Sequence, residues 1–258
     1  MVVSIEDLGS LSVTQQKVEL VERKGIGHPD YLIDACSESV SVALSKYYLK
    51  NYGKIFHHNV DKGILVGGKS KPEFGGGIIE EPIEIIVVGR AVIEINSQDQ
   101  KKCIPIDSIS INAMKNCIKN LVRYLDVDKD VKFDYKIREG SKDLVGIFDV
   151  SNDVPLANDT SIGIGYAPFS SAENLTLNIE KLLNSKKTKN KFPAIGEDIK
   201  VMTLREKNDM KVTVAMPLID RFIKNIGDYF GLIDNVKLYI DEYVESLNLD
   251  GKVKLYLN

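Results

Sequence analysis

Hydrophobic and polar positions along this chain predict a mixture of strands and helices. Residues 18–23 partly alternate as a strand does, and the most apolar run, residues 83–95, is dense in the strand-favouring residues Ile and Val. Between these two runs, apolar side chains recur at helical spacing from Leu32 to Tyr47. We therefore expect a first strand, a helix that ends near Leu49, and a strongly apolar strand later.

The second half of the chain carries the same kinds of signal. They predict a helix capped by Asp107, a strand at 131–137, a polar loop at 138–143, a helix from the capping box Ser170-Ser-Ala-Glu173 to Asn184, a solvated basic link at 185–190, a hairpin from 196–204 and 210–216, a helix at 228–247 and a strand at 252–257. This order of elements indicates an α+β fold, with mixed β-sheets and helices packed on one face.

A chain of 258 residues can bury a full core, and we expect two domains. We assign residues 20–150 to a central domain for nucleotide and metal, and residues 1–19 with 151–258 to a second α+β domain. The sequence stops abruptly on its last strand. That stop suggests either a truncated chain or one that needs a partner segment.

Charge and composition exclude several classes of function. The net charge is −3 and charges of both signs are interspersed, so we expect no nucleic-acid partner and no membrane partner. The first residues lack the pattern of a secretory signal, and no apolar run has membrane-spanning length. Cys36, Cys103 and Cys117 have neither disulfide-like nor metal-like spacing. They are typical of reduced thiols in a cytoplasmic protein.

One polar stretch, Lys24-Gly25-Ile26-Gly27-His28-Pro29-Asp30, precedes the first helix and has the chemistry of a phosphate and metal corner. Two glycines let backbone N–H groups approach a ligand, and a helix N-terminus attracts phosphate. Pro29 suits the first helical position, which places His28 at the N-cap. Asp30 offers the hard oxygen that Mg²⁺ prefers. The alternative is a plain loop in which Asp30 only complements the helix dipole.

Taken together, the polar segments of this chain resemble one family, the archaeal type of S-adenosylmethionine synthetase (methionine adenosyltransferase). The matching segments are residues 21–30, 57–61, 66–68, 74–77, 82–83, 89–90, 140–145, 155–161, 163, 165–168 and 193–202. They follow the order of the family across essentially the whole chain, which corresponds to about the N-terminal two thirds of a family member.

The resemblance implies an enzyme that joins ATP and L-methionine, with water, to give S-adenosylmethionine, phosphate and diphosphate. Family members use Mg²⁺ and K⁺, and they form homodimers or larger homo-oligomers whose active site is shared between subunits. A neutral sulfur nucleophile needs no general base. Such an enzyme mainly positions its substrates and stabilises the charge of the leaving triphosphate.

The resemblance also assigns roles to individual residues. His28 and Lys200 match phosphate-contacting catalytic residues, Asp159 matches an aspartate that holds substrate, and Asp30 matches a Mg²⁺ ligand. The segment assigned to ATP consists of Arg138, Glu139, Gly140, Ser141, Lys142 and Asp143.

Several positions depart from the family pattern. Arg138-Glu139 replaces Gly-Gln in the ATP segment, Tyr31 replaces a serine, and Lys62 replaces a glutamine. Arg138 and Glu139 could simply pair with each other. The last third of the family, with its C-terminal domain and further phosphate and metal groups, has no counterpart here. Two hypotheses follow: an incomplete synthetase that a complementing C-terminal chain would activate, or a catalytically inactive paralogue that serves as a nucleotide-binding or scaffold subunit.

Overall fold

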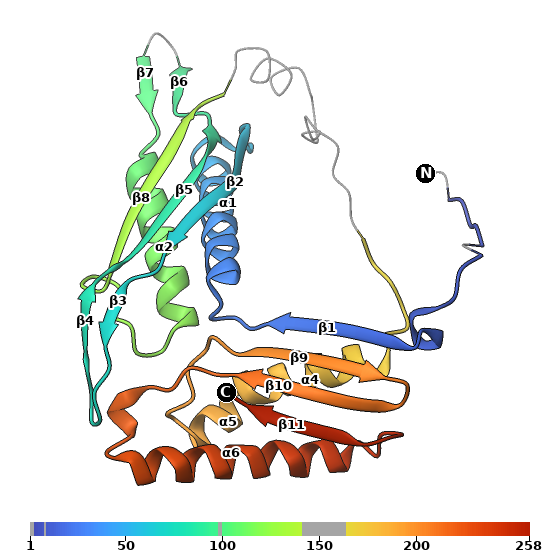
Figure 1. Ribbon diagram of the computed structural model, residues 1–258. Coiled ribbons are helices and arrows are strands. Elements are labelled where there is room, and N and C mark those ends of the chain that lie inside the picture. The colour runs from blue at the N-terminus through green and yellow to red at the C-terminus, as the bar shows by residue number, and fades with distance from the viewer. Residues whose placement is uncertain (1–2, 8, 98–99, 141–163) are drawn as a thin grey trace.

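The computed structural model describes residues 3–7, 9–97, 100–140 and 164–258, and its elements form two packed bodies of sheet and helix (Figure 1). Each body has its own buried hydrophobic cluster, one between residues 32 and 137 and the other between residues 172 and 255. The mixture of sheets and helices confirms the predicted α+β class. The division into domains at residues 20 and 150 stays a prediction.

In the first body, two helices cover one face of a three-stranded sheet. The sheet has the order β2-β5-β8, with β5 antiparallel to β2 and parallel to β8. Two small hairpins, β3 with β4 and β6 with β7, extend from it. The elements are α1 (Pro29–Tyr52), α2 (Ile106–Leu121), β2 (His58–Val66), β3 (Lys69–Lys71), β4 (Ile78–Glu81), β5 (Ile83–Ala91), β6 (Glu94–Ser97), β7 (Gln100–Cys103) and β8 (Val131–Glu139).

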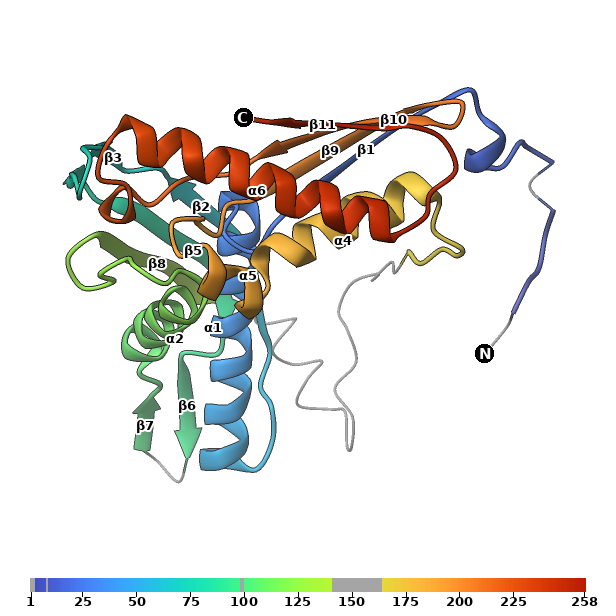
Figure 2. The ribbon, with the colours of Figure 1, turned by 90° about the horizontal axis from the view of Figure 1, so that it is seen from below.

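In the second body, a four-stranded sheet has the order β1-β9-β10-β11, and α4, α5 and α6 lie along one side of it (Figures 1 and 2). The first strand of the chain pairs antiparallel with β9, and β11 runs parallel to β10. The elements are η1 (Val13–Gln15), β1 (Val18–Lys24), α4 (Ser171–Asn184), α5 (Lys186–Lys191), β9 (Lys200–Glu206), β10 (Asp209–Ala215), η2 (Asp220–Phe222), α6 (Ile226–Ser246) and β11 (Val253–Leu257).

Local sequence explains where the predicted helices begin and end. The side chain of His28 caps α1, Pro29 is its first residue, and Gly53 ends it with a left-handed φ of 74°. The capping box of Ser170 and Glu173 starts α4 as predicted. In the part of the chain that the structure describes, no helix has both the length and the apolar character needed to cross a membrane.

Three sequence predictions were wrong in detail. The N-cap of α2 is Pro105, and Asp107 lies in the first turn, where a carboxylate complements the helix dipole. Residues 185–190 are not a solvated link, because Ser185 caps the short helix α5 and Thr188 and Lys189 are buried. Arg138 and Glu139 do not belong to a loop, since β8 continues through both of them.

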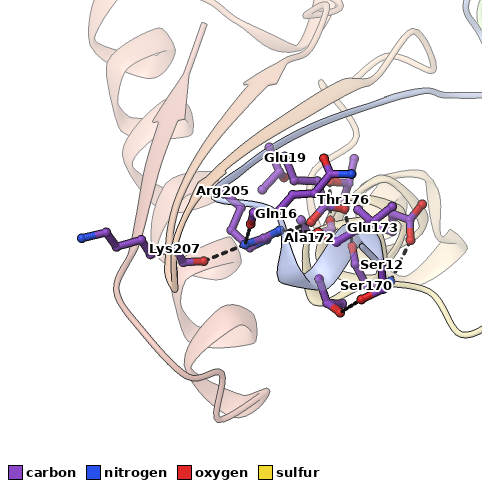
Figure 3. A network of polar contacts seen from close by, with 12 residues as sticks. Ser12, Gln16, Glu19, Ser170, Ala172, Glu173, Thr176, Arg205 and Lys207 are labelled. Carbon is purple, nitrogen blue, oxygen red and sulfur yellow. Dashed lines mark hydrogen bonds and ion pairs between the residues drawn. The ribbon is translucent and has the colours of Figure 1, made fainter. Parts of the chain in front are cut away.

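A buried polar network fixes the start of β1 against β9 and α4 (Figure 3). Arg205 Nε lies 2.8 Å from Glu19 Oε2, and these side chains are only 6–7% exposed. Arg205 also donates hydrogen bonds to the carbonyls of Val13 and Gln16, while Ser170 Oγ donates to Glu19. Breaking one member of a buried ion pair typically costs about 3–5 kcal/mol, so this network is a strong local constraint.

Candidate active site at the start of α1

The glycines of the corner before α1 serve close packing. A Cβ added to Gly27 would lie 2.5 Å from the carbonyl carbon of Glu197 and 2.6 Å from the nitrogen of Asp198. The N–H of Gly25 donates to Ile199 O at 2.7 Å, and the N–H of Gly27 donates to Glu197 O at 3.2 Å. These two N–H groups are therefore occupied by the chain itself. The interpretation that they cradle a phosphate was wrong.

The first backbone donors of α1 are also largely committed. Pro29 has no N–H, and the N–H of Asp30 donates to Nδ1 of His28 at 3.1 Å. Because Nδ1 accepts this bond, the proton of the neutral imidazole lies on Nε2, which can donate it to a ligand. Attraction of an anion to the corner therefore depends on charged side chains more than on the end of the helix.

Those side chains come from β1, α1 and β9. Lys24 and Lys200 are paired residues in the antiparallel register of β1 and β9. Lys24 Nζ lies 2.6 Å from Asp30 Oδ2, and Lys200 Nζ lies 3.1 Å from Glu22 Oε2. The hydrogen bond to Lys24 lowers the pKa of Asp30, and the same bond raises the pKa of Lys24. The Asp30 side chain is 65% exposed, so its oxygens remain accessible to a ligand.

Asp198 is a further acidic group at this corner that the sequence prediction did not single out. Burial raises the pKa of Asp198, while interactions with the nearby His28 and Lys200 act in the opposite direction. Asp198 lies on the segment that packs against Gly27. It was visible in the matching segment 193–202 as the acid two residues before Lys200.

The predicted ATP segment begins at the far end of the first body. His58 pairs with Ala91, and Ala91 with Glu139, so the end of β8 lies at the edge where β2 begins, near the C-terminus of α1 (Figure 1). A helix of 24 residues is about 36 Å long. The chain therefore brings His28, Asp30 and Lys200 together but does not bring Arg138, Glu139 or Gly140 to them.

Some of the remaining predicted site residues cannot be placed, and one predicted contact in the ATP segment does not fit the structure. Ser141, Lys142, Asp143 and Asp159 lie outside the described residues. The suggested pairing of Arg138 with Glu139 does not fit a strand, because successive side chains point to opposite faces. Arg90 Nη1 instead donates to the carbonyl of Glu139 at 3.1 Å, which anchors the end of β8 to β5.

Two other positions that depart from the family pattern lie within the residues that the structure describes. Tyr31 lies in the first turn of α1 and is 41% exposed. Lys62 is occupied by Asp61, whose two carboxylate oxygens each lie 2.9 Å from its Nζ.

Comparison with known families shows to which family this chain belongs. The family model described as S-adenosylmethionine synthetase (AdoMet synthetase) matches residues 1–258. The chain belongs to the S-adenosylmethionine synthetase family. The predicted resemblance is thereby confirmed, and it rests on relatives as well as on the motifs.

The relatives with this name are archaeal and longer. The S-adenosylmethionine synthase of Sulfolobus acidocaldarius is 48% identical over 242 residues, which are 94% of this chain and 60% of the relative. That of Pyrobaculum neutrophilum is 46% identical over 255 residues, which are 98% of this chain and 63% of the relative. The chain thus spans about three fifths of the length of the curated S-adenosylmethionine synthetases it matches.

A solved structure supports the fold of this S-adenosylmethionine synthetase family member. An unusual S-adenosylmethionine synthetase from Campylobacter jejuni superposes with a TM-score of 0.51 over 94% of this chain and 60% of the other, at 13% sequence identity. At that identity the similarity concerns the fold alone.

Proposed function

We propose that this chain supplies the ATP- and methionine-handling part of a methionine adenosyltransferase. The reaction would convert ATP, L-methionine and water to S-adenosylmethionine, phosphate and diphosphate. The observation that carries this proposal is the corner where β1, α1 and β9 meet, which brings together Lys24, His28, Asp30, Asp198 and Lys200. Family membership says which chemistry such a corner would perform.

The proposed roles follow from charge. Attack of sulfur on C5′ of ATP places negative charge on the departing triphosphate, and cations aimed at that charge lower the barrier. His28 and Lys200 are the proposed donors to the phosphate chain. Lys24 would add a second cation beside Lys200 once a bound metal draws Asp30 away from it. Asp159 is the proposed substrate-holding residue, and it lies outside the described residues.

Asp30 fits part of a Mg²⁺ site. Its exposed carboxylate is a hard oxygen donor, and Mg²⁺ is commonly bound by one or two carboxylates with substrate phosphates and waters. Among the described residues, no group of three or more His, Cys, Asp or Glu side chains could hold a metal ion. Asp30 would therefore be one ligand of a site completed by ATP. Bound Mg²⁺ would supply charge stabilisation to the phosphates. K⁺ is proposed from the family pattern.

We further propose a homodimer with a shared active site. Arg138, Glu139 and Gly140 stand about one length of α1, roughly 36 Å, from the corner of their own chain. A second copy could present that segment to the corner, and a complementing C-terminal chain could add further groups. The proposed setting is the cytoplasm, since Cys36, Cys103 and Cys117 are free thiols.

The test is formation of S-adenosylmethionine from ATP and methionine, measured with and without the separately expressed C-terminal part of an archaeal relative. Product that forms on mixing supports the proposal, and product from the chain alone supports it more strongly. No product in either case, together with retained binding of ATP, would show that the chain is a nucleotide-binding scaffold subunit instead.

Substitution of Asp30 by Asn tests the metal assignment. The amide keeps the size of the side chain but removes the charge that attracts Mg²⁺, so we expect the Mg²⁺-dependent affinity for ATP to fall about tenfold or more. The matched control is Asp34→Asn, an exposed aspartate one turn further along α1. Calorimetric titration with ATP at fixed Mg²⁺ measures both. Equal affinity in the wild type and Asp30→Asn contradicts the assignment.

A further inference from the structure

One side chain of the first body reaches into the second body behind the corner before α1. Arg123 lies just after the end of α2, where that helix comes close to the second body (Figure 1). Its guanidinium forms an ion pair with Glu197, and its Nη2 donates to the carbonyl of Ile195 and, at 3.4 Å, to that of Pro193. All three partners belong to the segment 193–197, which connects α5 to β9.

The segment 193–197 depends on side chains for its position. It lies outside the helices and strands of the structure, apart from an isolated bridge between Ile195 and Leu218. A second cation, Lys189, donates to the carbonyls of Ile195 and Gly196. Backbone carbonyls away from water need such donors, so two cationic side chains take the place that a neighbouring strand would otherwise fill.

The backbone of Glu197 in turn holds the corner before α1. Its carbonyl accepts hydrogen bonds from the N–H of Gly27 at 3.2 Å and from the N–H of Ile199 at 2.8 Å. A Cβ added to Gly27 would lie only 2.6 Å from the Cβ of Glu197, so the two residues are in direct contact. A shift of Glu197 would therefore move Gly27 and the next residue, His28, which caps α1. Only Glu197 stands between Arg123 and this corner.

The chemistry of the Arg123–Glu197 pair suits a geometric role. The Glu197 side chain is 7% exposed and that of Arg123 is 29% exposed. Removal of both charges from water offsets much of their attraction, so such a pair adds little stability over an apolar pair of the same size. What the pair supplies is direction. The planar guanidinium presents its donors in a fixed fork, so Nε and Nη2 hold a carboxylate and a carbonyl of one segment at the same time.

We propose that Arg123 is a positioning residue for the candidate active site, and that by holding Glu197 it sets the places of His28 and Asp198 at the corner before α1. This role rests on the function proposed for that corner. Arg123 acts through Glu197 and is not itself a ligand of the substrate. Because Arg123 comes from the first body and Glu197 from the second, affinity for the substrate is linked to the docking of the two bodies.

Histidine resonances test the position of His28 without reference to catalysis. The chain has three histidines, and the variant His28→Gln assigns the ring Cε1–H signal of His28 by its loss from the NMR spectrum. In Arg123→Met, which removes the fork but keeps an unbranched side chain, we expect the signal of His28 to shift at constant pH. The signals of His57 and His58, which lie at the start of β2, should stay in place.

Arg221→Met is the matched control. The guanidinium carbon of Arg221 lies 5.1 Å from the centre of the Tyr124 ring, and that of Arg123 lies 4.9 Å from the same ring. In the part of the chain that the structure describes, Arg221 forms no hydrogen bond or ion pair with the segment 193–197. The control variant thus loses a cation at the same junction, and it should leave the His28 signal where it is in the wild type.

Calorimetric titration of the full chain with ATP in the presence of Mg²⁺ measures the consequence for the site. We expect Arg123→Met to weaken ATP binding at least fivefold and Arg221→Met to weaken it less than twofold. Arg123→Lys keeps a positive charge for Glu197 but lacks the fork. Its affinity for ATP should lie between those of the wild type and Arg123→Met, and its His28 signal should shift in the same direction by a smaller amount.

An unchanged His28 signal or an unchanged affinity for ATP in Arg123→Met would overturn the proposal. Equal changes in Arg123→Met and Arg221→Met would overturn it as well, because they would show only a general loosening of the junction. Circular dichroism establishes whether each variant folds, and if Arg123→Met does not, an unshifted His28 signal in Arg123→Lys overturns the proposal. If the wild type does not bind ATP, the proposed function fails, and the His28 signal alone decides the positioning role.

Discussion

At the scale of single residues, Lys189 shows how strongly the fold can change an ordinary side chain. It belongs to α5, its side chain is buried, and carbonyls of the 195–196 segment accept its hydrogen bonds. Desolvation disfavours the charged form, which is why the pKa falls from 10.5 to about 8. Protonation of this one group is therefore linked to the stability of the whole second body.

The stability of the chain should rise with pH between about 8 and 10.5 because of Lys189. In that interval the unfolded lysine binds a proton and the folded one does not, so the free energy of unfolding increases with pH. The total is on the order of 3 kcal/mol, from about 1.4 kcal/mol per pH unit. Urea unfolding at several pH values measures this rise. Lys189→Met should lose it, and equal slopes in both proteins would contradict the account.

Cys36 and Cys117, which α1 and α2 bring together, should titrate as a pair. The thiol of the buried Cys36, acting as a hydrogen-bond donor, lowers the pKa of Cys117, while the same contact and burial raise the pKa of Cys36. Removal of the donor in Cys36→Ala should raise the pKa of Cys117 and slow its alkylation by iodoacetamide several-fold at pH 7. Mass spectrometry follows Cys117 directly. Cys103→Ala is the control and should leave the rate unchanged.

At the scale of elements, the corner before α1 depends on how closely two backbone segments approach each other. β1 and β9 pair in register up to Lys24 and Lys200, and beyond that point the corner passes directly against residues 197–199. This contact places Asp198 beside His28. Glycine is required at the contact because any larger residue would force the two segments apart.

Gly27→Ala should therefore disturb both stability and ligand binding. The new Cβ would overlap backbone atoms of Glu197 and Asp198, which cannot rotate away, so we expect a loss of about 1–3 kcal/mol. Chemical denaturation measures the loss, and titration with ATP should show weaker binding. Gly67→Ala is the matched control, since its Cβ would meet no atom within 4 Å. Similar losses in both variants would contradict this role of Gly27.

The sequence predicted most elements correctly where local signals were strong. Helix α1 was predicted from its spacing, its N-cap and Pro29, and α4 from its capping box. The sequence-based prediction failed for α5, because its six polar residues resemble a linker and their burial depends on distant partners such as Tyr239. It also failed at the end of β8, where pairing with β5 outweighs the polar character of Arg138 and Glu139.

At the scale of the whole molecule, polar and aromatic contacts join the two bodies. Arg123, just after α2, binds Glu197 and the carbonyl of Ile195, and the ring of Tyr124 lies 5.3 Å from that of Phe222. Asp220 Oδ2 accepts a hydrogen bond from the N–H of Gly77 at 2.7 Å. Interfaces of this polar kind hold domains in place but contribute less than a shared hydrophobic core.

Arg123→Met should loosen the junction of the two bodies. The substitution leaves Glu197 buried without its partner, so we expect a loss of about 2–4 kcal/mol, less than for a fully buried pair because Arg123 is partly exposed. Calorimetry should then resolve two unfolding transitions. The double variant Arg123→Met, Glu197→Gln should recover part of the loss, because no lone charge remains. A single unshifted transition in Arg123→Met would show that the ion pair does not couple the bodies.

The candidate site could be predicted from the sequence only as a set of residues, and its geometry could not. Motif order identified His28, Asp30 and Lys200, and the pairing of β1 with β9 brings them together. Nothing in the motifs indicated that Arg138 would lie at the other end of α1, because that depends on the direction of β8 within its sheet. Because β8 runs away from the corner before α1, the proposed function relies on a second copy of the chain to bring the ATP segment to that corner.

The pairing of β1 with β9 also has a consequence in time. Strand β1 is made first, yet its partner comes after the whole first body and α4, so the closure of this pair spans most of the chain. Contacts between residues so far apart in the sequence form late, because closing the intervening loop costs conformational entropy before the contacts can stabilise the fold. The first body can collapse around α1 on its own, while the corner that contains His28 and Lys200 is assembled in a last step. Competence to bind a substrate would therefore appear only when folding is complete.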